Sequence, residues 1–207
     1  MRSKMMNYVS KYNSLPKVYK SFRYMRNKSY ITSQLFENDL IYICLPINSN
    51  VSRLIMSPVF WYKHSKVPLL SIFLNSPEYL NKEILFNEIY LINFILTLNI
   101  QFTTTNLGLC YGDLSLLLAA GNINDRYMLK NSKCILHNIH NKHTIYEMYH
   151  TFFKKYWKEY IINHHKIMLY YQQFTSLGYN NINNITARKL YFKAIECKQY
   201  GIIDKII

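Results

Sequence analysis

The residues best suited to metal chemistry gather in one histidine-rich stretch. His137, His140, His143 and Glu147 follow one another closely in the chain. Imidazole and carboxylate groups are ligands of zinc, and protein zinc sites draw several such ligands from nearby positions. This spacing suits one metal ion only if a single helix spans all four residues, whereas strand-like residues lead into His137. The sequence therefore disfavours a zinc site here and indicates no other metal.

Cysteine is the other residue type that could provide a nucleophile or a metal ligand. Cys44, Cys110, Cys134 and Cys197 lie far apart, without a C-x-x-C pair. This distribution predicts neither a disulfide framework nor a metal centre, and a reducing compartment is the default expectation. The sequence carries no motif that predicts a bound cofactor.

Strand-like and helix-like segments alternate along the chain. These elements must position the histidine, glutamate and cysteine side chains. An apolar stripe predicts a helix over Leu80–Leu98, a short helix runs from Asp113 to Ala120 before Gly121, and a long helix covers Thr144 to about Gln173. A final short helix is expected near Lys193–Gln199. Strands are expected at Leu40–Leu45, Leu69–Leu74, Gln101–Asn106 and Lys133–Leu136. The alternation indicates the α/β class.

The net charge is strongly positive but unevenly distributed. Lys and Arg number 25 against 11 Asp and Glu, which makes the formal net charge +14. Eight of the basic residues precede Glu37, the first acidic residue. We therefore divide the chain into a basic N-terminal arm or transit remnant at 1–32 and a mildly basic domain at 33–207. A basic surface can bind nucleic acid, but an excess concentrated in an arm predicts neither a nucleic-acid nor a membrane partner.

Several blocks of this domain resemble the ClpP family of Clp serine proteases. They agree with the family in order and spacing from about residue 35 to residue 207. The blocks are Leu74–Pro77 (LNSP), Leu116–Gly121 (LLLAAG), Arg126–Tyr127 (RY), Asn131–His137 (NSKCILH), Thr186–Lys189 (TARK) and Tyr200–Ile207 (YGIIDKII). The resemblance implies a ClpP/crotonase-like fold in which ββα repeats form a head, with a long handle helix around 138–174.

The resemblance also assigns the positions of a catalytic triad. Two of the three positions hold residues that cannot perform the role of the family's residue. The nucleophilic serine of the family falls on Gly112, which has no side chain. The base falls on His137, but the orienting aspartate falls on Lys189, whose ammonium cannot accept an imidazole N–H. Ser115 lies one helical turn beyond Gly112 and is expected to point elsewhere.

The oxyanion hole implied by the resemblance is altered as well. In the family, backbone N–H groups of a glycine pair and of the residue after the serine face the developing negative charge. Here the glycine pair is replaced by Glu78 and Tyr79, and Asp113 follows Gly112. Carboxylates beside a developing oxyanion are electrostatically unfavourable.

These departures resemble the inactive, ClpR-type subunits of the family. Such a subunit would complete a ring of about seven members, alone or with catalytic ClpP subunits, and would help to form the surface on which an AAA+ Clp chaperone docks. The basic arm and the AT-rich codon usage of the composition favour a plastid-type organelle, such as a plastid or apicoplast.

Two enzymatic alternatives remain open. The same fold occurs in crotonase-like enzymes, whose oxyanion hole binds acyl-CoA thioesters without a serine, but Glu78 and Asp113 would crowd that hole. A residual serine peptidase would have to use Ser115.

Overall fold

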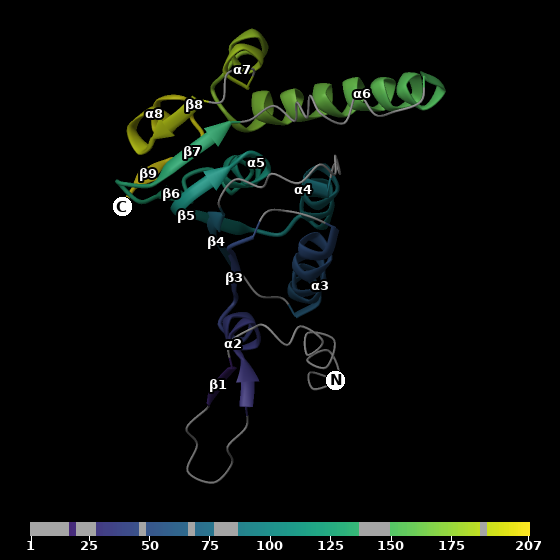
Figure 1. Ribbon diagram of the computed structural model, residues 1–207. Coiled ribbons are helices and arrows are strands. Elements are labelled where there is room, and N and C mark those ends of the chain that lie inside the picture. Colours follow the sequence, from purple (N-terminus) through teal and green to yellow (C-terminus); the bar gives the residue numbers. More distant parts are fainter. Residues whose placement is uncertain are drawn as a thin grey trace.

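A largely parallel β-sheet is the framework of the molecule (Figure 1). The computed structural model describes residues 17–19, 28–45, 49–65, 69–76, 87–136, 150–186 and 190–207. Within them, the main sheet has the order β3-β4-β5-β6-β9, and β7 and β8 continue from the far half of β5. Its strands are β3 (Leu40–Ile43), β4 (Leu70–Ser76), β5 (Phe102–Tyr111), β6 (Arg126–Met128), β7 (Lys133–Leu136), β8 (Leu190–Lys193) and β9 (Lys205–Ile206). Every pairing is parallel except that of β7 with β8.

Helices cover one face of this sheet, and a long helix extends past its end (Figure 1). The first group consists of α3 (Ser49–Ser65), α4 (Asn87–Leu98) and α5 (Asp113–Ala119). The long helix is α6 (His150–Phe174), followed by α7 (Tyr179–Thr186) and α8 (Ala194–Gln199). The strand–helix alternation confirms the predicted α/β class with a head and a long helix. Among the described residues, no helix has the length and apolar character needed to cross a membrane.

The buried side chains follow the periods expected for each element. In β4 every second residue is buried, from Leu70 to Ser76, as expected for a strand with one face on the core. Helix α5 is buried along its described length, and Leu116 and Leu117 have no exposed surface. Helix α3, to which the sequence analysis assigned no element, buries Val51, Ile55, Val59 and Tyr62 at helical spacing. The helical pattern was not recognised in the sequence because α3 contains Pro58, and proline usually interrupts a helix.

Strand β5 is longer than predicted because it continues through Gly108. Its pairing with β4 shifts register between Leu74 and Ser76. The Oδ1 atom of Asn75 fills the irregularity and accepts a hydrogen bond of 3.2 Å from the backbone N–H of Leu109. A Cβ atom at Gly108 would lie 2.5 Å from that oxygen, so any larger residue there would have to displace the Asn75 side chain. The long strand pairs first with β6 and then with β7.

A buried arginine connects elements that are far apart in the sequence. Arg126 at the start of β6 forms a two-pronged ion pair with Asp204, with its Nε atom 2.8 Å from Oδ2 and its Nη2 atom 2.6 Å from Oδ1. Its Nη1 atom donates to the carbonyl oxygens of Ala119, Phe174 and Gly201. One guanidinium thus joins the ends of α5, α6 and α8 to the sheet.

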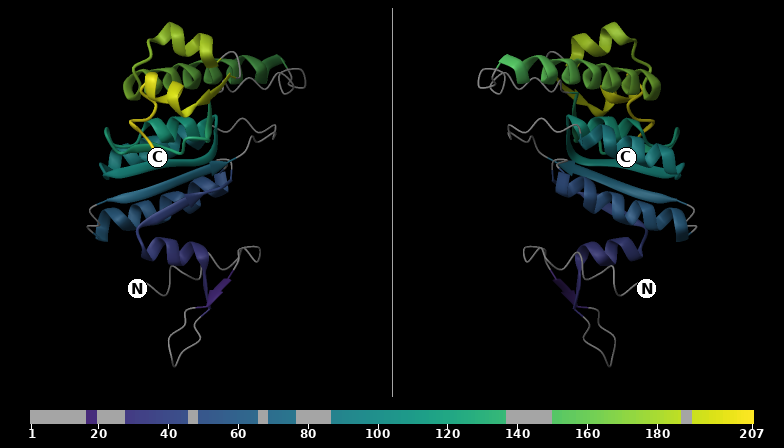
Figure 2. Two further views of the ribbon diagram at one scale, coloured as in Figure 1. Left: turned by 90° about the vertical axis from the view of Figure 1, so that its left-hand side faces the viewer. Right: turned by 90° about the vertical axis from the view of Figure 1, so that its right-hand side faces the viewer.

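The described part of the basic arm forms a small antiparallel strand pair. Strands β1 (Lys17–Tyr19) and β2 (Lys28–Tyr30) pair in register and lead into α2 (Ile31–Glu37). They lie at the opposite end of the molecule from α6 (Figure 2). The buried Tyr62 hydroxyl donates to the Phe36 carbonyl oxygen at 2.9 Å and thereby fastens α2 to the head.

Candidate functional site

The candidate site is the sharp turn that joins β5 to α5. Strand β5 ends at Tyr111, and α5 begins at Asp113, so Gly112 alone makes the turn. Its backbone has φ 54° and ψ −110°. A positive φ is unfavourable for residues with a Cβ atom but open to glycine. A strand-to-helix turn of this kind is where many hydrolases present a nucleophile, and here the presented residue has no side chain.

Backbone hydrogen bonds hold the turn in place. The Gly112 N–H donates to the Ile135 carbonyl oxygen of β7 at 2.9 Å. The Gly112 carbonyl oxygen accepts from the Ser115 N–H at 2.9 Å and also from the Ser115 hydroxyl. The turn is therefore well formed even though it carries no reacting group.

Ser115, one helical turn beyond Gly112, points into the core. Its side chain is fully buried, and its Oγ atom lies 2.6 Å from the Tyr171 hydroxyl of α6. The Ser115 hydroxyl is therefore directed toward α6, in the direction that the sequence analysis expected. The two hydroxyls instead tie the long helix to the turn.

We expect Tyr171→Phe to lower the free energy of unfolding by about 1 kcal/mol, because a typical buried hydrogen bond contributes about that much. Denaturant unfolding checks this value. Tyr90→Phe is the matched control, since Tyr90 is 60% exposed, and it should change stability by only a few tenths of a kcal/mol. Equal effects of the two substitutions would contradict a stabilising role for the Tyr171 hydroxyl.

Three cysteines that are distant in sequence lie together behind the turn, which the sequence analysis did not anticipate. Cys110 and Cys134 are register partners on β5 and β7, and both are fully buried, as is Cys197 of α8. Hydrogen bonding with Cys110, together with burial, raises the pKa of the Cys134 thiol well above its ordinary value. The thiol therefore stays protonated and does not act as a nucleophile. Among the described residues, no group of histidines, cysteines and carboxylates could hold a metal ion.

The structure brings the neighbours of the other predicted site residues to the same region. Strand β7 ends at Leu136, directly before His137, and β8 begins at Leu190, directly after Lys189. Leu136 and Leu190 are Cα partners in the β7–β8 pair. His137 and Lys189 themselves lie outside the described residues.

The remaining predicted positions are described in part or not at all. Asp113 is the first residue of α5, and its backbone continues directly from the Gly112 turn. Glu78 and Tyr79 follow β4, which ends at Ser76, and lie outside the described residues. The residues at which the sequence analysis disfavoured a zinc site, His137, His140, His143 and Glu147, lie outside them as well.

Comparisons with known proteins place this geometry in a family. A family model described as Clp protease matches residues 24–207. A solved structure of a peptidase from Plasmodium falciparum superimposes with a TM-score of 0.72 at 24% sequence identity, over 84% of this chain and 98% of that one. No curated protein matches the chain. At that identity the solved structure establishes the fold. The family match includes the β5–α5 turn and the sequence on both sides of it.

Proposed function

The chain belongs to the Clp protease family, and from this premise we propose that it serves there as a catalytically inactive, ClpR-type subunit. The observation that carries the proposal is the β5–α5 turn. It keeps a sharp strand-to-helix geometry at Gly112, where the resemblance assigns the nucleophilic serine. A turn that keeps its geometry but carries no nucleophile is expected of a subunit whose role is structural.

The nearby side chains support the same proposal. The candidate replacement nucleophiles behind the turn, Ser115 and Cys134, are fully buried, and hydrolysis requires a nucleophile that substrate can reach. The resemblance also assigns the orienting position to Lys189. A positive charge there would oppose the imidazolium that a serine protease forms during catalysis.

The assembly part of the proposal is a ring of about seven copies, either alone or with catalytic ClpP subunits, with an AAA+ Clp chaperone as partner. The long helix α6 supports it, since α6 extends past the sheet (Figure 1) and exposes Ile161, Ile162 and Leu169. We propose a single ring, because the segment after His140 carries histidine, lysine and tyrosine instead of the family's glycine-rich strand. We further propose a plastid-type organelle, on the grounds of the acid-free basic arm.

We expect the purified chain to form a closed ring whose mass is about seven times that of one chain, or to enter such a ring when it is mixed with an active ClpP subunit. Light scattering of the chain, with and without that subunit, measures this directly. A monodisperse monomer under both conditions, at micromolar concentration, would contradict the assembly proposal.

Labelling separates a structural subunit from an enzyme in the same preparations. A fluorophosphonate should label the active ClpP subunit and leave this chain unlabelled. Thioesterase and hydratase assays on acyl-CoA substrates should also be negative, and turnover there would favour the crotonase-like alternative.

A further inference from the structure

Three thiols gather in the core behind the Gly112 turn, and the proposed function uses none of them. Cys110 of β5 and Cys134 of β7 are register partners on adjacent strands. The Sγ atom of Cys197 in α8 lies 4.0 Å from the carbonyl oxygen of Phe192, which is the register partner of Cys134. All three thiols are free and have no exposed surface. The cluster thus lies where two strands and a helix meet.

The positions of Cys110 and Cys134 suit a disulfide bond. Neighbouring strands of a sheet lie about 4.8 Å apart, and disulfide bonds join residues whose Cα atoms are about 4.4–6.8 Å apart. Both side chains belong to the hydrophobic core, so they point to the same face of the sheet. A bond between the two sulfur atoms can therefore form without a change of register.

Such a bond would lie directly behind the candidate site. Cys110 precedes the Gly112 turn by two residues. Cys134 directly precedes Ile135, whose carbonyl oxygen accepts from the Gly112 N–H at 2.9 Å. A covalent link between β5 and β7 would thus fix the strand pairing that holds the turn.

Strand β8 and helix α8 cover the thiols, and we call Leu190–Gln199 the β8–α8 cover. Among the described strands, β8 pairs with β7 alone, so it can open locally while the rest of the sheet stays paired. Phe192 is the central side chain of the cover. It is buried opposite Cys134, and its ring packs edge-on against that of Tyr200 with 5.4 Å between the ring centres.

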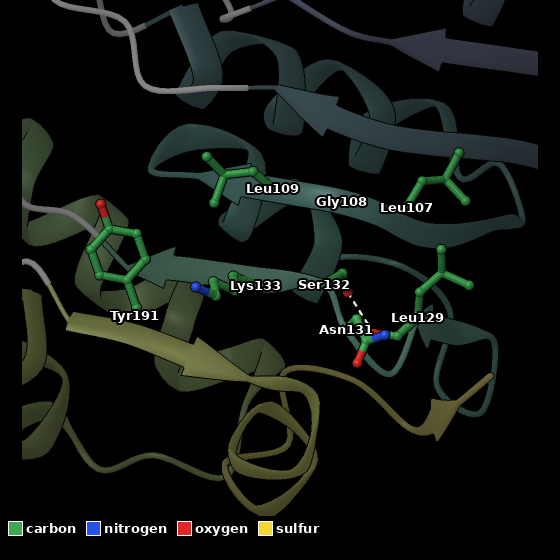
Figure 3. Close-up of a pocket in the computed structure, with 8 residues that line it drawn as sticks. All are labelled: Leu107, Gly108, Leu109, Leu129, Asn131, Ser132, Lys133 and Tyr191. Atoms are coloured by element: carbon green, nitrogen blue, oxygen red, sulfur yellow. Dashed lines mark hydrogen bonds between the residues drawn. The ribbon is translucent and has the colours of Figure 1, made fainter.

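The other face of the same strands carries a shallow groove (Figure 3). Its lining includes Lys133 and Tyr191 and contains no cysteine. Lys133 directly precedes Cys134, and Tyr191 directly precedes Phe192. Side chains alternate between the two faces of a strand, so the groove and the thiols lie on opposite faces. We therefore expect a reagent to reach the thiols through the β8–α8 cover and not from the groove.

The closed fold keeps the cluster reduced. Hydrogen bonding with Cys110, followed by burial, raises the pKa of the Cys134 thiol well above its ordinary value, and a protonated thiol is a poor nucleophile. When the cover opens, water enters, the pKa falls toward its ordinary value and some thiolate forms. Opening thus supplies both access and reactivity.

From this arrangement we propose that the cluster is a peroxide-sensitive switch, in which opening of the β8–α8 cover lets hydrogen peroxide oxidise Cys134 and a disulfide bond then forms with Cys110. In the first step the Cys134 sulfur attacks the O–O bond, becomes a sulfenic acid and releases water. In the second step the Cys110 sulfur attacks that sulfur, the S–S bond forms and a second water leaves. The two thiols lose two electrons and two protons, and the peroxide accepts both. This inference does not depend on ring formation or on the absence of catalysis.

The test uses the full chain with Cys44→Ser, because Cys44 is exposed and would react without any opening. The probe is hydrogen peroxide, followed by alkylation of the remaining thiols and mass spectrometry of the peptides. We expect Cys110 and Cys134 to lose their thiols together, as a bonded pair, while Cys197 stays free. A dithiol reductant should restore both thiols. A bond between Cys134 and Cys197, or sulfinic acids without a bond, would overturn the proposal.

Two neighbouring substitutions test the cover. Phe192→Ala should speed the loss of the thiols at least about tenfold, because removal of a buried ring lowers the free energy of opening. Tyr191→Ala is the matched control, since that side chain is 55% exposed and lines the groove, and it should change the rate less than about twofold. Equal acceleration by both substitutions would overturn the proposal.

A second measurement covers the case in which Phe192→Ala does not fold. In the Cys44→Ser chain, the rate of thiol loss should rise with urea below the unfolding transition, because urea favours the open form. A rate that does not depend on urea would show that the thiols react without opening and would overturn the proposal.

The oxidised chain should unfold at a higher urea concentration than the reduced chain, because a disulfide bond restricts the unfolded state. Each oxidised sample is compared with the same sample after dithiol treatment, which reverses the disulfide and leaves oxidised methionine unchanged. Cys110→Ala cannot form the bond, so dithiol treatment should not shift its midpoint. A midpoint that the bond lowers would show that it distorts the strand pair and would overturn the proposal.

Discussion

Purified protein should show no peptidase turnover, and Gly112→Ser should not create it. Loss of the nucleophile costs on the order of 10⁶ in kcat in a serine protease. A restored serine would still depend on His137, whose orienting position is assigned to Lys189. In the template triad, loss of the aspartate alone costs about 10⁴. The measurement is turnover of short fluorogenic peptides by the chain free of active ClpP.

The geometry of the turn adds a stability cost to the same experiment. At φ 54° and ψ −110° a side chain strains the backbone, and such strain costs about 1–3 kcal/mol. Gly112→Ala is the matched control, since it introduces the Cβ atom without the hydroxyl. Both variants should lose similar stability, and neither should turn over peptide.

Two outcomes distinguish a contaminant from a working site. Wild-type turnover that survives His137→Ala would point to a contaminating protease. Turnover that His137→Ala abolishes would demonstrate a catalytic site in this chain and contradict the proposed inactivity.

Arg126→Met should destabilise the fold by about 3–5 kcal/mol, the usual cost when one partner of a buried ion pair is removed. The substitution leaves the Asp204 carboxylate without its counter-charge. It also leaves the carbonyl oxygens of Ala119, Phe174 and Gly201 without their Arg126 donor. Chemical denaturation measures the loss. Lys130→Met is the control, because Lys130 is exposed in the same region, and it should change stability by less than about 0.5 kcal/mol.

Two further variants test whether geometry or charge matters at this position. Arg126→Lys should recover only part of the stability, because one ammonium cannot match the planar, multiply bonded guanidinium. Replacing Arg126 with Met and Asp204 with Leu together should be less harmful than Arg126→Met alone, since no unpaired buried charge remains. A double variant as unstable as the single one would contradict this account.

The same ion pair predicts how stability depends on pH. Partial burial alone would raise the pKa of Asp204, but the hydrogen bonds and the positive charge of Arg126 outweigh it and hold that pKa below its ordinary value. The carboxylate therefore stabilises the fold fully above its ordinary pKa of about 3.9. This contribution is lost progressively as the pH falls below about 4 and through the lowered pKa. Asp204→Asn should remove this part of the acid sensitivity, as seen in unfolding curves at several pH values.

The sequence by itself determined the class of fold and the family, and its resemblance to that family assigned the nucleophile's position to Gly112. The apolar strings at Leu40 and Leu69 and the block that ends at Gly121 are local patterns, so their periods and spacing can be read directly. Counting back from Gly121 along the resemblance located Gly112, and the structure then showed that this residue forms the β5–α5 turn. Helix α3 escaped prediction because a proline inside it resembles a helix end.

Only the tertiary structure decided which distant residues meet, because neither periodicity nor spacing records such contacts. Arg126 and Asp204 are separated by 78 positions, and Ser115 and Tyr171 by 56. The grouping of Cys110, Cys134 and Cys197 depends on how β5, β7 and α8 pack together. The juxtaposition of Lys133 with Lys193 follows from the register of two strands that are remote in sequence. Register is set by the packing of a buried face, so this pairing could not be predicted from the sequence.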